Sequence, residues 1–401
     1  MSKKILIQTK TFFPKVTPES KRIYSIVESL LKRGWEVHIY TSINKNNCKE
    51  AETLLPGIRV FPIANQCVHN KGIIGRLFYN FRLYMNTLLI FKKNGFKDYD
   101  VVLATSPEIL PCLAIRKIAK KNKYFFVFDV RDIWPDVAFE MRSFTEKSPQ
   151  SIIFNHVANA LYKSASLITT VSSEKISKLK DKRACINKDI VLIENGFDER
   201  MLELESDEDT IKKMNLKDKN IVCFIGNVGF AQGLKKYIDL AKEYSLNESL
   251  RFLVVGKGSD KANVISYAHR VGADNVEFFD PISQRGIATL LRHAKISYVS
   301  LVSDSMIDSI PTKLYESLGF GCPTLLVACG SSRSLIDATQ HGLYARPSSF
   351  SEIKETFGRL LKLLPSLESK KSYIAEYILN NYSRNRNSER FADILIQKLN
   401  V

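Results

Sequence analysis

The stretch KILIQTKTFFPKVTPESKRIYSIVESLLKRGWEVHIYT, residues 4–41, decides the fold. An apolar, β-branched run opens it at residues 4–9, and a second such run closes it at residues 36–41. Between them, residues 18–33 repeat apolar side chains at helical spacing and stop at Gly34. A strand, a helix and a second strand in this order form a β-α-β unit, whose strands are parallel. The stretch therefore predicts an α/β protein with a parallel sheet.

The same alternation runs along the rest of the chain and is interrupted once, by an acidic and less apolar segment at residues 199–219. We therefore predict two Rossmann-like domains, residues 1–198 and 199–383. A C-terminal helix at residues 384–401 follows, and packing back on the N-terminal domain is one alternative for it, since its composition does not decide its partner. The expected strands are residues 4–9, 36–41, 58–63, 101–104, 124–129, 167–171 and 190–193, then 221–225, 251–255, 276–279, 296–299 and 324–327.

Length and composition exclude several classes of protein. A chain of 401 residues that is 45% hydrophobic is neither a disordered tail nor a small disulfide-stapled module. The net charge of +17 is uneven, because residues 1–200 hold 33 basic and 19 acidic side chains, against 26 and 23 in the remainder. This excess predicts an anionic partner for the first half, whether nucleic acid, a phosphorylated lipid or a membrane surface.

Cysteine usage and the apolar runs indicate the compartment. The seven cysteines form no CxxC pair, and most lie in apolar contexts, which favours reduced thiols. No apolar run is long enough for a signal peptide or a membrane span. We therefore expect a cytoplasmic protein.

Residues 304–323, DSMIDSIPTKLYESLGFGCP, hold the most informative polar group. Pro311 suits the first helical position, and Ile310 before it has no side-chain oxygen to cap the free N–H groups. A phosphate can accept from those donors, with the Lys313 ammonium beside it. Glu316 lies roughly 4 to 5 Å further along the helix axis, where its carboxylate can accept hydrogen bonds from a ribose. A solvated amphipathic helix with Lys313 and Glu316 on its outer face is the structural alternative.

This segment resembles the donor-site signature of GT-B glycosyltransferases, specifically glycosyltransferase family 4. In that family an acidic residue, seven intervening positions and a Glu precede a small-residue turn and a Pro. Here the pair is Asp308 and Glu316, so Asp stands where the family usually has Glu. The resemblance implies an α/β GT-B fold, with two Rossmann-like parallel-sheet domains facing across a cleft. It also implies catalytic roles for Asp308 and Lys313, and a reaction that retains the anomeric configuration.

Other stretches fall where family members have comparable ones, namely FIGNVGFAQG at 224–233, LVVGKG at 253–258 and NVEFFDP at 275–281. Many relatives place an Arg and a Lys in the first of these loops to neutralise the donor diphosphate. This chain has Asn227 and Gln232 there, so Lys313 is expected to supply that charge. The donor-binding residues implied are Gly226, Asn227, Gln232, Gly256, Pro281, Pro311, Thr312, Lys313 and Glu316.

In the first half, FDVRDIWPD at residues 128–136 resembles a motif of bacterial O-antigen and capsule enzymes that are similar to N-acetylfucosamine transferases. An acidic loop after an apolar strand can present Asp132 to sugar hydroxyls as a catalytic residue, with Arg131 beside it. A helix cap followed by surface charge is the alternative. Residues 12–22 replace the Gly-Gly loop of many relatives, so Glu19 and Arg22 are expected at the acceptor side of the cleft.

Neither a metal nor another cofactor is expected. Residues 207–209, DED, match the DxD motif of metal-dependent transferases, but they lie in the acidic linker and not at the end of an apolar strand. The six histidines show no metal-ligand spacing. Helix N-termini and basic side chains can neutralise a leaving diphosphate without a metal.

Residues 71–97, KGIIGRLFYNFRLYMNTLLIFKKNGFK, predict a basic helix rich in aromatic residues. This composition is typical of a segment that lies in a membrane interface. Four basic residues are expected to face the anionic inner surface of the membrane, with further basic residues at 116–123. These four are Arg76, Arg82, Lys92 and Lys93. A buried core helix with a basic rim is the alternative.

These observations predict a retaining, metal-independent glycosyltransferase. It would move a sugar, expected to be an N-acetylated hexosamine, from a UDP-sugar to a lipid-diphosphate-linked saccharide in O-antigen or capsule assembly. One alternative is a GT-B nucleotide-sugar epimerase, although no acid/base pair for proton abstraction stands out. Another is a nucleic-acid-binding protein that uses the basic first half, but no recognised module is present and we expect no nucleic-acid partner.

Overall fold

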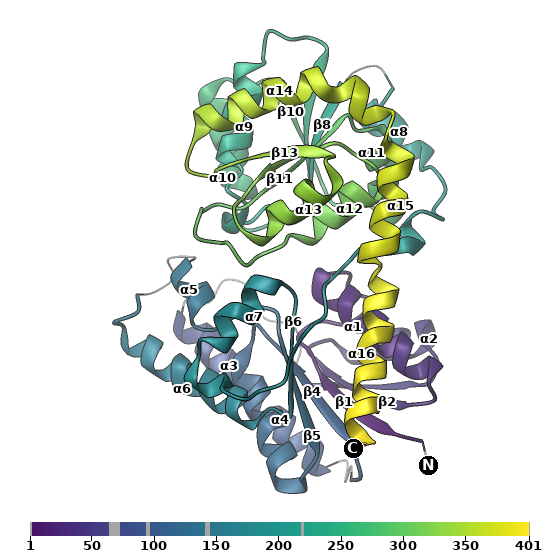
Figure 1. Cartoon of the computed structure of the whole chain (residues 1–401), viewed down its shortest axis with the longest axis vertical. Helices are drawn as coiled ribbons and strands as arrows, with labels where there is room; N and C mark the ends of the chain where they lie inside the picture. The colour runs from purple at the N-terminus through teal and green to yellow at the C-terminus, as the bar shows by residue number, and fades with distance from the viewer. Residues whose placement is uncertain (1, 64–72, 94–96, 141–144, 218–219, 401) are drawn as a thin grey trace. The chain divides into compact units, whose positions relative to one another are not determined.

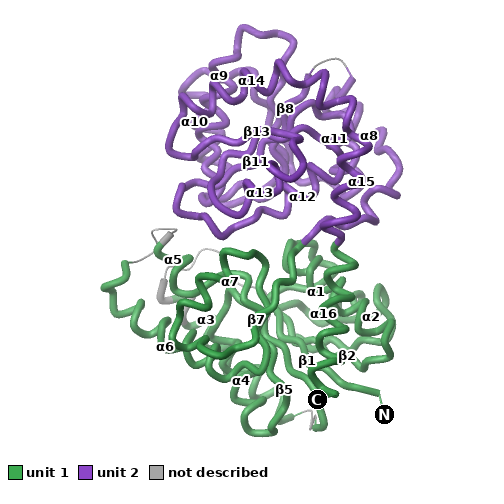
Figure 2. Tube along the Cα trace, viewed as in Figure 1, with its two compact units in different colours: residues 1–195, 384–401 green, residues 196–383 purple. Residues whose placement is uncertain are grey.

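The computed structural model describes residues 2–63, 73–93, 97–140, 145–217 and 220–400 (Figure 1). The chain forms two compact units, shown in green and purple in Figure 2. Unit 1 comprises Met1–Asn195 and Arg384–Val401, and unit 2 comprises Gly196–Ser383. The first junction lies three residues before the boundary expected at 198/199, and the C-terminal helix belongs to unit 1.

Unit 1 is built on a seven-stranded parallel sheet in the order β3-β2-β1-β4-β5-β6-β7. Because β1 pairs with both β2 and β4, the strand order reverses beside β1, at the kind of switch point where α/β sheets bind ligands. The strands are β1 (Lys4–Gln8), β2 (Glu36–Thr41), β3 (Ile58–Pro62), β4 (Val101–Thr105), β5 (Phe125–Val130), β6 (Leu167–Thr170) and β7 (Ile190–Leu192).

The first helix of unit 1 begins where its sequence dictates. The Thr17 hydroxyl accepts from the Ser20 N–H, and the Ser20 hydroxyl accepts from the Thr17 N–H, which forms a capping box before Pro18 in the first turn. The helices are α1 (Pro18–Lys32), α2 (Lys45–Leu54), α3 (Ile73–Lys93), α4 (Ile109–Asn122), α5 (Asp136–Glu140), α6 (Pro149–Ser164), α7 (Ser173–Lys180) and α16 (Arg384–Leu399), with a 3-10 turn η1 (Arg183–Cys185).

Helix α16 packs on α1, although the two lie at opposite ends of the sequence (Figure 1). Its Phe391 and Leu395 are buried in the same apolar core as Ile23 of α1. A salt bridge of 2.7 Å between Arg33 and Asp393 lies at the edge of this contact. The C-terminal helix is therefore part of the core of unit 1.

Unit 2 is built on a six-stranded parallel sheet in the order β10-β9-β8-β11-β12-β13. Alternate residues of β8 point into two separate cores, with Val222 and Phe224 in one and Cys223 and Ile225 in the other. Helices α9, α10 and α14 cover the first core, and α8, α11, α12, α13 and α15 cover the second. The strands are β8 (Asn220–Ile225), β9 (Leu250–Val255), β10 (Val276–Phe279), β11 (Ile296–Ser300), β12 (Thr324–Val327) and β13 (Gly342–Ala345).

The helices of unit 2 connect these strands on both faces of the sheet. They are α8 (Glu208–Met214), α9 (Lys235–Glu243), α10 (Lys261–Val271), α11 (Gln284–His293), α12 (Thr312–Gly319), α13 (Ser331–Thr339), α14 (Phe350–Glu368) and α15 (Lys371–Tyr382), with 3-10 turns η2 (Glu199–Met201) and η3 (Phe230–Gln232). No helix among the described residues is long and apolar enough to cross a membrane. The fold is that of two Rossmann-like parallel-sheet domains, as predicted.

Candidate functional site

The loops after β8 and β9 meet backbone to backbone at the carboxyl edge of the unit 2 sheet. A Cβ atom on Gly256 would lie 1.9 Å from the Gly226 carbonyl oxygen, and one on Gly258 would lie 2.1 Å from that of Val228. Gly226 and Gly256 also have φ values of 122° and 150°, which L side chains rarely adopt. Glycine at these positions therefore leaves the edge of the sheet free of side chains beside the start of α12.

Helix α12 begins one residue later than the sequence predicted. Pro311 is its N-cap and not its first helical residue, because the ψ angle of 130° at Pro311 is extended. The consequence drawn from the sequence is unchanged, since no side chain caps the first N–H groups of the helix. Thr312 and Lys313 stand in the first turn, partly buried.

The Lys313 ammonium points to the segment after β8. Its Nζ donates to Gln232 Oε1 at 3.1 Å and lies 3.6 Å from the centroid of the Phe224 ring. Among the described residues, Lys313 makes no salt bridge. Burial lowers the pKa of Lys313 to about 7, although Glu316 in the next turn favours its charged form. An anion that meets this ammonium would interact with a charge that no carboxylate neutralises.

The other predicted donor residues lie around this group. Glu316 lines a small cavity with Lys313 and Ser317 and is partly buried. Asp308, in contrast, is 4% exposed, and the Ser309 hydroxyl donates to its Oδ1 at 3.4 Å. The carboxylate of Asp308 therefore lies inside the loop before α12. Asn227 and Pro281 are exposed on the loops after β8 and β10.

The carboxyl edge of the unit 1 sheet holds a buried ion pair. Arg22 binds Asp129 in a bidentate manner, with Nη2–Oδ1 at 2.8 Å and Nε–Oδ2 at 3.2 Å. The hydroxyls of Thr105 and Thr169 donate to the same carboxylate, and Arg22 Nη1 donates to the Ile193 carbonyl at 2.7 Å. Burial by itself would raise the pKa of Asp129, but Arg22 and the Thr169 hydroxyl hold it below its ordinary value. This group ties the first helix to strands β4, β5 and β6.

The position expected for Arg22, at the acceptor side of the cleft, stays a prediction. Arg22 is 3% exposed, and its guanidinium is bound by Asp129 and by backbone carbonyls. Glu19 is buried nearby, where it accepts from the Thr9 hydroxyl at 2.6 Å and from the Lys10 N–H at 2.8 Å. Both residues fix the shape of this edge, because their polar atoms are used within unit 1.

Arg131 and Asp132 stand beside this network, partly buried. Arg131 Nη1 lies 3.4 Å from Glu19 Oε2, and the Ser106 hydroxyl accepts from the N–H groups of both residues. Among the described residues, no hydrogen bond or ion pair involves the Asp132 carboxylate. Asp132 is therefore the acidic side chain of this loop that is best placed to meet a ligand.

Sequence reasoning did not single out Lys10 and Glu108, which form an ion pair beside Glu19. Burial raises the pKa of Glu108, with Lys10 opposing that effect. Neither residue belongs to a motif, since 98 positions separate them and the fold alone brings them together. Asp129 did carry a signal, because it is the charged residue of the otherwise apolar strand FFVFDV.

Two family descriptions match the chain one after the other. "Glycosyltransferase Family 4" matches residues 20–200, and "Glycosyl transferases group 1" matches residues 206–377. The chain belongs to the GT-B glycosyltransferases. The epimerase and nucleic-acid-binding alternatives are therefore without support.

Relatives of this glycosyltransferase are distant in sequence. The putative colanic acid biosynthesis glycosyl transferase WcaI of Escherichia coli is 26% identical over 165 residues, which span 40% of this chain and 40% of that protein. Among solved structures, sucrose-phosphate synthase of Thermosynechococcus elongatus is similar with a TM-score of 0.80 at 14% identity, covering 98% of both chains. WaaG, a glycosyltransferase involved in lipopolysaccharide biosynthesis, gives 0.74 at 15%, covering 98% of this chain and 99% of its own. Anabaena Alr3699/HepE in complex with UDP-glucose gives 0.71 at 15%, with the same coverage.

The DED segment at residues 207–209 of the glycosyltransferase begins a helix. Asp207 is the N-cap of α8, and its Oδ1 accepts from the Thr210 N–H at 3.3 Å, which helps to lower the pKa of Asp207. In the part of the chain that the structure describes, no three His, Cys, Asp or Glu side chains cluster closely enough to hold a metal ion.

Helix α3 of the glycosyltransferase packs on α4 with one face and leaves a row of apolar side chains exposed. The row consists of Phe78, Phe81, Met85 and Leu89. Arg82, Lys92 and Lys93 are also exposed on this helix. Arg76 belongs to α3, but its side chain lies outside the described part of the structure, as do residues 71–72 and 94–96.

Proposed function

We propose that this glycosyltransferase is a retaining, metal-independent enzyme that uses a UDP-sugar, carrying an N-acetylated hexosamine. The acceptor is a lipid-diphosphate-linked saccharide in the assembly of O-antigen or capsule. The observation that carries the proposal is the position of Lys313 in the first turn of an uncapped helix, with Glu316 one turn further in.

The chemistry of donor cleavage explains how Lys313 and the uncapped start of α12 would stabilise the leaving diphosphate. Negative charge grows on the diphosphate as the glycosidic bond breaks, so groups that stabilise it most in the transition state accelerate the reaction. The Lys313 ammonium and the first N–H groups of α12 supply positive charge at one place. The diphosphate in turn favours the protonated form of Lys313, whose pKa in the free protein is about 7. Glu316 would hold the ribose hydroxyls.

Proteins similar to this chain support the donor and the pathway. Anabaena Alr3699/HepE binds UDP-glucose, WaaG is involved in lipopolysaccharide biosynthesis, and WcaI is assigned to colanic acid biosynthesis. All three are consistent with a nucleotide-sugar donor or with a bacterial surface polysaccharide as the product.

A donor screen tests the proposal. UDP-N-acetylglucosamine, UDP-N-acetylgalactosamine and UDP-glucose would be compared with GDP-mannose and dTDP-glucose by thermal shift and by hydrolysis, with and without EDTA. We expect the UDP-sugars to raise the Tm most and EDTA to change nothing. A preference for GDP or dTDP donors, or activity that EDTA abolishes and magnesium restores, would contradict it.

We further propose that the enzyme docks on the anionic inner face of the membrane through α3. The exposed apolar row would enter the interface, and the basic residues would meet the lipid headgroups, each contributing about 1 kcal/mol. The salt dependence of binding should then be partial, because salt screens the charges but not the apolar contacts.

Cosedimentation with phosphatidylglycerol vesicles tests this docking. We expect the fourfold variant Arg76→Ser, Arg82→Ser, Lys92→Ser, Lys93→Ser to lose most of its vesicle binding. A control with the same change in charge carries Lys45→Ser, Lys49→Ser, Arg359→Ser and Lys362→Ser, all at exposed positions elsewhere. Equal loss in both variants would show that net charge, and not α3, governs the binding.

A further inference from the structure

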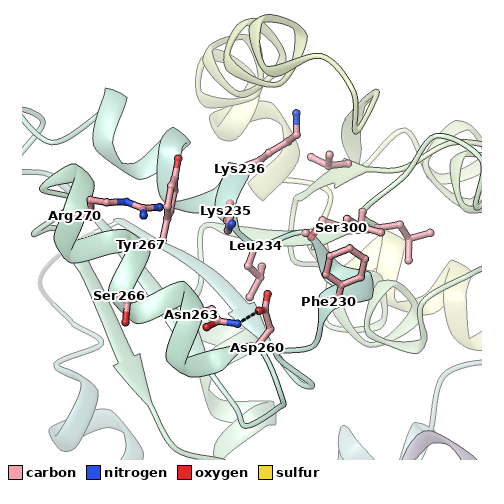
Figure 3. Close-up of a pocket in the computed structure, with 14 residues that line it drawn as sticks. Phe230, Leu234, Lys235, Lys236, Asp260, Asn263, Ser266, Tyr267, Arg270 and Ser300 are labelled. Atoms are coloured by element: carbon pink, nitrogen blue, oxygen red, sulfur yellow. Dashed lines mark hydrogen bonds between the residues drawn. The ribbon is translucent and has the colours of Figure 1, made fainter. Parts of the chain in front are cut away.

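A cavity of about 580 Å³ in unit 2 lies outside the group around Lys313 and Glu316 (Figure 3). It is bounded by the start of α9, one face of α10, and the ends of β11 and β12. Its volume falls in the range of about 300 to 1,000 Å³ that is typical of small-molecule sites. The residues proposed to hold the donor do not line it, so the cavity needs its own explanation.

Three basic residues, Lys235, Lys236 and Arg270, line this cavity. Within the described residues none of them makes a salt bridge. Lys235 Nζ lies 5.5 Å and Arg270 Cζ 5.2 Å from the centroid of the Tyr267 ring, and Figure 3 shows Arg270 lying along that ring. Contact with the negative face of an aromatic ring stabilises both cations on one wall without neutralising them. The cavity thus presents an excess of positive charge.

Two further features bear on the charge of the cavity. Asp260, the carboxylate among the lining residues, accepts from Asn263 Nδ2 at 2.8 Å (Figure 3) and offsets one of the three cations. Helix α9 begins at Lys235 after the N-cap Leu234, with no side-chain cap, so its dipole adds to the positive potential, while the Lys236 N–H already donates to the Gly233 carbonyl at 3.3 Å. A phosphate group matches three cations and a helix start better than a neutral ligand does.

The other residues that line the cavity combine an apolar side with hydrogen-bonding groups. Phe230 is 56% exposed at the edge of the cavity, so the face of its ring is available for contact. Leu301 and Val302 continue this apolar side, while Asn263 and Ser266 offer hydrogen-bonding groups. A sugar has the matching pattern, since its C–H groups can pack on an aromatic face while its hydroxyls bind polar side chains.

We propose that this cavity is a second ligand site, which binds a phosphorylated saccharide. The phosphate lies at the start of α9 and the sugar ring lies against Phe230. Lys236, which points away from Arg270 in Figure 3, would turn so that both cations meet the phosphate. The site is separate from the donor group but adjoins it, because the Gln232 side chain accepts from Lys313 while the Gln232 carbonyl accepts from Ser300, which lines the cavity. The inference does not depend on the proposed donor or acceptor.

Calorimetry with glucose 6-phosphate as the probe tests the site in the parent protein and in four variants, of which Phe230→Ala is also measured with inorganic phosphate. The double variant Lys236→Ser, Arg270→Ser removes two cations of the cavity. The matched control Arg359→Ser, Lys362→Ser removes one Arg and one Lys from exposed positions on α14. Lys313→Ala reports on binding in the donor group. Circular dichroism melting confirms that each variant is folded.

We expect the cavity variant to bind glucose 6-phosphate at least tenfold more weakly than the parent. The control and Lys313→Ala should stay within twofold of the parent, and saturating UDP should not displace the probe. Phe230→Ala should weaken binding of glucose 6-phosphate but not of inorganic phosphate. Absence of binding at millimolar probe, equal affinity in the cavity variant, or displacement by UDP would overturn the proposal.

Discussion

The two sheets each place a buried or partly buried cation at the carboxyl edge, and the two cations have opposite surroundings. Arg22 in unit 1 is bound to both oxygens of Asp129 and to a backbone carbonyl. Lys313 in unit 2 has an amide oxygen and an aromatic ring as its partners. The first cation stabilises the fold because its charge is neutralised, whereas the second can bind a ligand because its charge is not. Burial of a charged residue therefore does not by itself distinguish structure from function, but its partners do.

The largest effect should follow from removing the carboxylate in unit 1. Asp129→Ala leaves Arg22 buried without its counter-ion, which typically costs about 3 to 5 kcal/mol. We expect the free energy of unfolding, measured by urea denaturation of unit 1, to fall by that amount. Glu205→Ala, which removes the carboxylate of an exposed pair with Arg285, is the control and should cost less than about 1 kcal/mol. A loss for Asp129→Ala no larger than that of the control would break the comparison.

Removing the cation in unit 2 should weaken UDP binding with little effect on stability. In the role proposed for Lys313, the Lys313→Ala variant loses a charge-assisted hydrogen bond to the diphosphate, worth about 1.5 to 3 kcal/mol, or roughly 10- to 150-fold in Kd. Calorimetry with UDP and UMP in the parent and the variant measures this effect. The loss should be larger for UDP than for UMP, and the Tm should hold. An unchanged Kd for UDP would remove Lys313 from the diphosphate site.

The pH dependence of UDP binding should also depend on the charge of Lys313. The pKa of Lys313 in the free protein is about 7, so below pH 7 the ammonium is present before UDP binds. Above pH 7, binding must take up a proton, and the affinity should fall by up to about tenfold per pH unit until the pKa of the complex is reached. Lys313→Ala should flatten the profile between pH 7 and 9. A parent profile that is already flat would contradict the lowered pKa.

At acid pH, the stability of unit 1 should depend on the charge of Asp129. The pKa of Asp129 lies below its ordinary value, so the stability that it contributes is present above about pH 4. This stability is lost as the pH falls through the pKa of the folded state.

The smallest effect should come from neutralising Glu316. Glu316→Gln keeps a hydrogen-bond acceptor for the ribose but removes its charge, a difference of about 1 kcal/mol or roughly fivefold in Kd. The loss should be equal for UDP and UMP, because both carry the ribose. A loss confined to UDP would place Glu316 at the diphosphate and so sharpen the contrast with Lys313.

Most of the fold could be read from the sequence, since alternation of apolar strands and amphipathic helices is a local signal. All twelve expected strands are present, but β13 was missed because GLYA is short and begins with a glycine. Lys313 and Glu316 could be predicted as neighbours because they share one helix, although Pro311 was placed one residue too far inside it. The contact of Lys313 with Gln232 spans 81 residues and that of Arg22 with Asp129 spans 107. Such pairings depend on strand order, which no local pattern contains.

The chain passes between the two units twice, after residue 195 and after residue 383, and this has a consequence for the construction of chimeric enzymes. On the side of unit 2, the Phe197 N–H donates to the Tyr382 carbonyl at 2.7 Å, and on the side of unit 1, Arg384 Nε donates to the Asn195 carbonyl at 2.9 Å. Both ends of residues 196–383 are thus held together, as in a domain inserted at a single point of a host domain. We therefore expect that unit 2 can be exchanged as one continuous segment between related enzymes. A fragment that stops at residue 195 would instead expose the apolar face of α1 that α16 covers. A chimera that swaps donor specificity should carry residues 196–383 and leave α16 with its host.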